Sequence, residues 1–251
     1  MLLDGKNAVI YGAGGAIGGA VARAFAREGA TVFLTGRTAA KLDKVAEDIR
    51  AAGGKAETAV VDALDEHAVD THADAVVAKA GSLDISFNLI THGDVQGTPM
   101  AEMSVSDYLQ PVETGVRTTF LTARAAARHM KRQRSGVILV FGGDGDPVRE
   151  FHVGGLQVGF AALEAMRRQI SAELGPYGVR AVTLRTGGIP EVVPPDMPGG
   201  REIVESLEKA TMLGRAATLA DVGNVAAFVA SDKARSMTAA TANISCGALV
   251  D

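Results

Sequence analysis

The stretch Asn7–Gly36, NAVIYGAGGAIGGAVARAFAREGATVFLTG, decides the fold of this 251-residue chain. It opens with the apolar run NAVIYG (7–12), continues with small and apolar residues at helical spacing, and closes with a second apolar run, TVFLTG (31–36). A strand, a helix and a second strand in this order predict a right-handed crossover between parallel strands. The first four strand candidates, which are these two runs with AETAVVDA (56–63) and LDISFNLI (83–90), are apolar nearly throughout. Such runs indicate strands covered on both faces, so we expect helices on either side of a sheet.

The same alternation continues along the chain, with a long helix expected over 112–133 and another over about 157–174. Further strands are expected at AETAVVDA (56–63), LDISFNLI (83–90), GVILVFGG (136–143), VRAVTLR (179–185) and TANIS (241–245). This order predicts an α/β fold of the three-layer Rossmann type, a doubly wound parallel sheet of about seven strands in one domain over residues 1–251. The Pro- and Gly-rich stretch 187–200 opens a segment, about 187–212, that we expect to be a flexible loop on the substrate side.

Composition narrows the classes of function. Apolar residues make up 47% and charged residues 22%, as in ordinary globular proteins, and the net charge of -4 is spread without a basic stripe. Nucleic acid and anionic membrane are therefore not expected partners. No apolar run approaches the roughly 20 residues of a membrane span, and the N-terminus has no signal-peptide pattern. The single cysteine, Cys246, excludes an intrachain disulfide, so we expect a cytoplasmic protein.

The glycine cluster GAGGAIG (12–18) lies between the first strand and the first helix. Gly12 and Gly14 can take backbone angles closed to other residues, and Gly15 lets the main chain approach a ligand closely. A helix beginning near Ala16 offers free N–H groups and a positive dipole end, which suit a pyrophosphate. At the first strand-to-helix turn of an alternating chain, this cluster predicts nucleotide binding, with a ligand-free tight turn as the alternative.

The ends of the second and third strands bear on the choice of cofactor. An acid after the second strand would hold the ribose hydroxyls of NAD(H), but FLTGRT (33–38) has none. Arg37 could instead face a 2′-phosphate, which favours NADP(H) over NAD(H), or it could be a solvated loop residue. Asp62, after the third strand, could accept a hydrogen bond from an adenine amino group or serve as a turn residue.

These motifs together resemble the short-chain dehydrogenase/reductase family over nearly the whole chain. The first turn resembles the family's T-G-x-x-x-G-x-G, with Tyr11 for the threonine and Ala16 for the middle glycine. LDISFNLI resembles LDVLVNNAG and keeps Asn88. Later segments that resemble the family are TFLTARAAARHM (119–130), AALEAMRRQISAELGPYGVRAVTLRTGGI (161–189), LGRAATLADVGNVAAFVASDKARSMT (213–238) and NISCGALVD (243–251).

The resemblance implies an NAD(P)(H) cofactor, a small-molecule substrate, and a homotetramer or homodimer formed through helices near 112–133 and 157–174. It also implies which residues contact the cofactor. These are Gly12, Gly14, Gly15, Ala16, Ile17, Gly18, Arg37, Asp62, Ala63, Asn88, Gly187 and Ile189.

The chain departs from the family at its catalytic positions. Family members use a Tyr hydroxyl to give or take a proton, a Lys four residues later to tune it, a Ser to orient the substrate oxygen and an Asn to complete a relay. In that order the matching positions hold Leu156, Phe160, Gly142 or Gly143, and Gly115. No shift of the alignment restores the pair, because no Lys lies between Lys131 and Lys209 and the tyrosines are Tyr11, Tyr108 and Tyr177. The resemblance therefore implies that the standard mechanism is not available.

Other groups could act on the nicotinamide side. His92 follows the fourth strand, at the edge where open α/β sheets bind ligands, and could move a proton, contact the substrate or ribose, or be an ordinary loop residue. Asp144 follows the fifth strand and His152 precedes the altered helix. Each is a candidate for a chemical role, with a turn, cap or loop role as the alternative. No cluster has metal-ligand spacing, so no metal is expected.

Three functions stay open on the sequence alone. The first is an NADP(H)-linked oxidoreductase that has moved its acid or needs none, as in hydride delivery to an activated carbonyl or enone. The second is a catalytically silent nucleotide-binding or regulatory protein, and the third is an assembly partner of a catalytic relative. The first is favoured because small residues leave room for a ligand, namely Gly142, Gly143, Gly154, Gly155 and Gly159.

Overall fold

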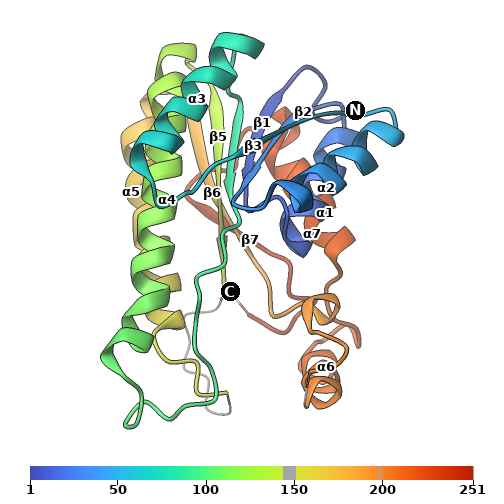
Figure 1. Ribbon diagram of the computed structural model, residues 1–251, viewed down its shortest axis with the longest axis vertical. Coiled ribbons are helices and arrows are strands. Elements are labelled where there is room, and N and C mark those ends of the chain that lie inside the picture. The colour runs from blue at the N-terminus through green and yellow to red at the C-terminus, as the bar shows by residue number, and fades with distance from the viewer. Residues whose placement is uncertain (144–150, 198, 251) are drawn as a thin grey trace.

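Seven parallel strands form one sheet in the order β3-β2-β1-β4-β5-β6-β7, with helices on both faces (Figure 1). The structure is a computed structural model that describes residues 1–143, 151–197 and 199–250. The strands are β1 (Asn7–Tyr11), β2 (Thr31–Gly36), β3 (Lys55–Val60), β4 (Ile85–Asn88), β5 (Gly136–Gly142), β6 (Val179–Arg185) and β7 (Ala240–Asn243). The predicted doubly wound parallel sheet of the Rossmann type is confirmed.

The helices divide into two layers. The α-helices are α1 (Ala16–Arg27), α2 (Ala39–Ala51), α3 (Glu66–Ala80), α4 (Val105–Gln133), α5 (Leu156–Leu174), α6 (Gly200–Lys209) and α7 (Leu219–Ala230). Short 3-10 turns are η1 (Gly175–Tyr177), η2 (Pro190–Val192) and η3 (Asp232–Ala234). Helices α1, α2 and α7 cover one face of the sheet, α3, α4 and α5 cover the other, and α6 stands apart from the sheet (Figure 1). Every helix in the described part of the chain is too short or too polar to span a bilayer.

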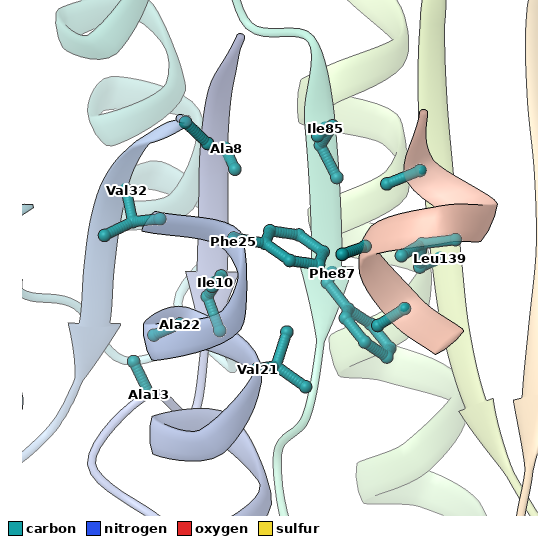
Figure 2. Close-up of a cluster of buried hydrophobic side chains, with 14 of the residues drawn as sticks. Ala8, Ile10, Ala13, Val21, Ala22, Phe25, Val32, Ile85, Phe87 and Leu139 are labelled. Atoms are coloured by element: carbon teal, nitrogen blue, oxygen red, sulfur yellow. The ribbon is translucent and has the colours of Figure 1, made fainter. Parts of the chain in front are cut away.

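The two faces of the sheet form two separate hydrophobic clusters, because successive side chains of a strand point to opposite sides. In β1, Ala8 and Ile10 belong to the cluster under α1, while Val9 and Tyr11 belong to the cluster under α4. Figure 2 shows the first cluster, where the ring of Phe25 from α1 points toward the strands. This core holds the strand ends that carry the glycine turn in a fixed position.

Three elements differ from the expectation drawn from sequence. β3 is an edge strand whose residues are alternately covered and open, so the prediction that both its faces are covered was wrong. α4 begins at Val105, before the expected 112–133, because Ser104 accepts a hydrogen bond from the Asp107 N–H at 3.0 Å and caps the helix. Pro111 lies within this helix and is buried, and it has no N–H to donate to the preceding turn.

The segment expected to be a loop over about 187–212 contains α6. Its sequence, GREIVESLEK, places Ile203, Val204 and Leu207 at helical spacing on one side and charged residues on the other. Gly188 has φ +108, and a Cβ there would lie 3.1 Å from Leu207 Cδ1. The glycine therefore allows the chain after β6 to approach the helix closely.

The first prediction concerns the core. Phe25 is fully buried, so Phe25→Ala removes a large side chain from a packed cluster and should lower the free energy of unfolding by about 3–5 kcal/mol. Phe228→Ala on α7, at a side chain 44% exposed, is the matched control and should cost much less. Urea unfolding followed by circular dichroism measures both. Equal losses for the two variants would contradict this description of the core.

Candidate functional site

A cavity opens where the strand order reverses, between the carboxyl ends of β1 and β4. The chain leaves β1 toward α1 on one face and leaves β4 toward α4 on the other, and such switch points are where open α/β sheets bind ligands. The cavity has a volume of about 340 Å³. Its lining is Gly12, Gly14, Gly15, Gly36, Arg37, Thr38, Lys41, Leu42, Asp62, Ala63, Leu64, Leu89, Ile90, Thr91, His92, Gly93, Gln110, Thr114 and Thr118.

The glycine turn forms one wall of the cavity. Gly12 has φ +78, and a Cβ on it would overlap the Leu89 main chain, with the carbonyl carbon at 2.8 Å. A Cβ on Gly18 would likewise lie 2.8 Å from the Gly12 carbonyl carbon. The turn is therefore packed against both β4 and its own helix, and both positions require glycine.

The N-terminus of α1 follows this turn directly. Gly15 is the N-cap and provides no side-chain cap to the N–H groups of the first turn, to which Ala16, Ile17 and Gly18 belong. Unsatisfied N–H groups at a helix start, with the positive end of the helix dipole, are suited to an anion such as a pyrophosphate. The glycines leave the main chain open on the cavity side, so the residues present fit a dinucleotide.

Positive charge gathers at the end of the cavity near β2. Arg37 is exposed and forms no ion pair with another described residue, and Lys41 lines the cavity from the first turn of α2. Asp62, which follows β3, also lines the cavity, and its Oδ1 accepts a hydrogen bond from the Leu64 N–H at 3.0 Å. Asp62 thus forms the turn that the sequence left as one alternative, and its other carboxylate oxygen remains available at the cavity.

His92 lies at the other end of the cavity. A Cβ on Gly115 would come within 3.2 Å of the His92 Cε1 and Nε2 atoms, so the imidazole fills space that a side chain on α4 would otherwise take. The ring lies 5.6 Å from the ring of Phe160, tilted by 54°. Burial lowers the pKa of His92, and the nearby Asp94 carboxylate opposes this effect in part.

An apolar wall begins at α5. Leu156 starts the helix and Phe160 follows one turn later. The Phe160 ring lies over Gly143, where a Cβ would be 2.7 Å from its Cδ2 atom. A Cβ on Gly155 would overlap the backbone carbonyl of Tyr108, so the start of α5 is pressed against α4.

Glu164 is an acidic side chain close to this wall. Its Oε1 lies 3.9 Å from the Cβ position of Gly142, and its Oε2 accepts a hydrogen bond from buried Arg167 at 2.7 Å. Burial raises the pKa of Glu164, but the bond and charge of Arg167 and further hydroxyl bonds outweigh this and lower it overall. Glu164 is therefore held as the carboxylate and has no proton to donate near neutral pH.

Several predicted cofactor residues lie away from the cavity lining. Asn88 is buried, and its amide donates to the hydroxyls of Thr118 and Thr119 at 2.9 and 3.0 Å, which ties the end of β4 to α4. A Cβ on Gly187 would lie 2.8 Å from the Cβ of Ala248, and Ile189 is part of the core under α1.

The remaining catalytic candidates are not brought together with His92. His152 is exposed in the loop before α5, with a left-handed φ of 45°, and does not line the cavity. Asp144 lies outside the described residues. Among the residues that are described, no group of three or more His, Cys, Asp or Glu side chains could hold a metal ion.

Three residues of the cavity lining, Lys41, Gln110 and Thr114, were not predicted from the sequence as site residues. Lys41 had a detectable signal, since it follows Arg37 by four residues at the start of a predicted helix. Gln110 had none, because it belongs to the part of α4 before residue 112 that the sequence did not predict. Thr114 lies within the predicted helix, but nothing in the sequence indicated that it faces the cavity, where its hydroxyl accepts a hydrogen bond from the Gln110 amide at 2.8 Å.

Comparison with known proteins finds relatives over nearly the whole chain. Residues 12–248 match the family model described as enoyl-(acyl carrier protein) reductase. The chain is 30% identical to the L-rhamnose 1-dehydrogenase (NAD(P)(+)) of Azotobacter vinelandii, an alignment that covers 100% of this chain and 99% of that protein. It is 27% identical to the 7alpha-hydroxysteroid dehydrogenase of Escherichia coli K12, with 92% and 89% covered.

Solved structures of dehydrogenases are similar over the same length. A 7alpha-hydroxysteroid dehydrogenase complexed with NADH and 7-oxo glycochenodeoxycholic acid has a TM-score of 0.86 and 27% identity, with 98% of this chain and 94% of that chain covered. A short-chain type dehydrogenase/reductase from Mycobacterium marinum has a TM-score of 0.86 and 26% identity, with 99% and 97% covered. The fold is that of the Rossmann-type oxidoreductases. The chain belongs to the short-chain dehydrogenase/reductase family.

The second prediction tests the contact between Gly143 and Phe160. Gly143→Ser places side-chain atoms where the Phe160 ring lies and should destabilise the protein, whereas Gly143→Ser combined with Phe160→Ala should recover part of that loss. A double-mutant cycle from urea unfolding should give a coupling energy of about 1–3 kcal/mol. Additive effects of the two substitutions would show that the ring does not occupy this space.

Proposed function

We propose that this protein is an NADP(H)-dependent oxidoreductase of the short-chain dehydrogenase/reductase family with a non-standard active site, acting on an activated carbonyl or enone. The observation that carries the proposal is the single cavity that joins the glycine turn and Arg37 at one end to His92 at the other. A nucleotide can therefore extend from the charged end toward the apolar wall of α5.

The proposed cofactor contacts follow from the lining. Gly12, Gly14 and Gly15 with the start of α1 would hold the pyrophosphate, and Asp62 the adenine amino group. Arg37, with Lys41 beside it, would neutralise a 2′-phosphate, which favours NADP(H) over NAD(H). Asn88 would act indirectly, by fixing the end of β4 against α4.

The active site is proposed to lack the family's usual proton donor. We assign the Tyr and Lys positions to Leu156 and Phe160, and the Asn position to Gly115, on the order and spacing of the flanking segments. The relatives are named as dehydrogenases and reductases, which supports the reaction class. With these residues at the catalytic positions, proton transfer in this protein would have to differ from that of other family members.

The mechanism is limited to what these residues can do. A bound nicotinamide supplies a hydride donor or acceptor. Leu156 and Phe160 exclude water from the reacting carbon and hold an apolar substrate by contact, and no described cation lies in this wall to bind the substrate oxygen. The proton reaches the product from a relocated group or from water.

A catalytically silent nucleotide-binding protein is the second candidate. It is favoured by one specific observation, that Phe160 fills the space above Gly143 where a serine would lie. A site closed in this way could retain the nucleotide without admitting a substrate. Turnover separates the two functions, because both include nucleotide binding.

The surroundings of the site suggest its assembly. We propose a single domain over residues 1–251 that forms a homodimer or homotetramer through α4 and α5. Phe120 on α4 and Val158 on α5 are 50% and 47% exposed and would be covered there. The loop side near α6 would border the substrate.

The third prediction concerns cofactor choice. Arg37→Ala should weaken NADPH binding about tenfold or more, the loss expected for one charge-assisted hydrogen bond, and should leave NADH binding nearly unchanged. Lys44→Ala, an exposed lysine of α2 outside the cavity, is the control. Isothermal titration calorimetry measures all of these affinities. Equal weakening for both nucleotides would refute the assignment of Arg37 to the 2′-phosphate.

The fourth prediction concerns turnover. The wild-type protein should oxidise NADPH in the presence of at least one member of a panel of acetophenone, 1-indanone and 2-cyclohexenone, followed by the loss of absorbance of the reduced nicotinamide. NADPH that binds in calorimetry without being consumed by any of them would favour the silent protein. Absence of binding at millimolar concentration would exclude both functions.

A further inference from the structure

We propose that His92 is the proton-transfer group of this active site, moved from α5 to the loop after β4, and that the site interconverts an apolar ketone and its secondary alcohol. This rests on the proposed function. An oxidoreductase without the usual proton donor could have a relocated acid or need none, and here the acid is relocated. It is carried by the place of the imidazole in the cavity and by the side chains around it.

The space for His92 is created by Gly115. The Cβ position of Gly115 lies 3.2 Å from Cε1 and Nε2 and 3.3 Å from Nδ1, so three ring atoms stand against a bare stretch of α4. Any larger residue at this position would push the ring outward. Glycine is normally unfavourable in the middle of a long helix. At residue 115 it is buried and leaves the space that the His92 ring occupies.

The second neighbour of the imidazole is Phe160, at 5.6 Å between ring centroids. The two rings meet where the wall of α5 approaches the cavity, so a substrate held against Phe160 also lies beside the His92 ring. The loop carrying His92 begins at Leu89, whose carbonyl packs on Gly12. The imidazole is thereby fixed relative to the glycine turn that would hold the nucleotide.

The imidazole is free to exchange protons. No hydrogen bond joins it to another described residue, and it lines the cavity. Asp94, in the same loop, is the charged group of the described residues that acts on it, while α4 and α5 present Gly115 and Phe160. Because burial outweighs Asp94, the pKa of His92 lies below its usual 6.5 and the ring is neutral at pH 7.

The reaction balances with His92 as the base. In alcohol oxidation the hydroxyl O–H bond breaks and its proton passes to an imidazole nitrogen, while the carbinol C–H bond breaks and the hydride passes to NADP⁺. The alcohol carbon is oxidised to a ketone, NADP⁺ is reduced, and the imidazolium then releases its proton to water. In the reverse direction the imidazolium donates the proton to the carbonyl oxygen.

Nuclear magnetic resonance of the imidazole C–H groups tests the placement without turnover. His92→Gln identifies the resonance, whose midpoint in the wild type should lie below 6.5. Saturation with NADP⁺ should shift the resonance and lower this midpoint, because the nicotinamide adds positive charge nearby. Binding in calorimetry with no change at His92 overturns this inference alone, whereas absence of binding overturns the proposed function as well.

Kinetics test the role. With NADP⁺ and a panel of cyclohexanol, 1-phenylethanol and 1-indanol, His92→Gln should lower kcat about 10²–10⁴-fold and leave the NADP⁺ affinity unchanged. In the wild type, kcat/KM should rise with pH through the His92 pKa and become flat above it, since the neutral ring is the base, and the variant should lose this dependence. His67→Gln, on the exposed side of α3, is the histidine control.

Two further variants separate chemistry from structure. Gly115→Ala should lower kcat and leave the NADP⁺ affinity unchanged, because the new methyl group displaces the ring. Tyr108→Phe, at the tyrosine whose backbone touches the start of α5, should keep full activity. Turnover retained in His92→Gln, lost in Tyr108→Phe, or absent from the wild type against the whole panel would overturn the assignment.

Discussion

The close approach of Gly12 to the Leu89 carbonyl is the constraint on which the site depends. It joins the ends of two strands that are distant in sequence and adjacent in the sheet, at the point where the chain turns to opposite faces. Any side chain at residue 12 would separate them. Because α1 follows one strand and the His92 loop follows the other, this contact and the pairing of β1 with β4 bring the glycine turn and the start of the His92 loop side by side.

The pattern of apolar residues along the sequence correctly predicts the strands that are buried on both faces of the sheet. The runs NAVIYG and TVFLTG become β1 and β2 because buried parallel strands are apolar nearly throughout. The β3 prediction was wrong about burial, since an edge position depends on the sheet order and not on composition. α6 was missed because prolines and glycines precede it, although its own ten residues have a clear helical pattern.

A site residue could be predicted from the sequence only where its own type and its place after a strand indicate its role. Arg37 and Asp62 follow strand ends, and the structure brings both to the cavity, as strand alternation requires. The relation of His92 to Gly115 and Phe160 could not be read from the chain, because it joins a loop, the middle of α4 and the start of α5. Whether Asn88 faces the nucleotide or the protein is likewise a tertiary matter, decided by the positions of Thr118 and Thr119.

The overlap of Phe160 with the space above Gly143 also constrains how this protein can change over time. A side chain gained at residue 143 meets the aromatic ring, because a Cβ there would lie 2.7 Å from the Phe160 Cδ2 atom. A residue larger than glycine at 143 therefore fits only if a smaller residue replaces Phe160 first. The order in which substitutions occur is thus constrained at these two positions, and the effect of each depends on the other.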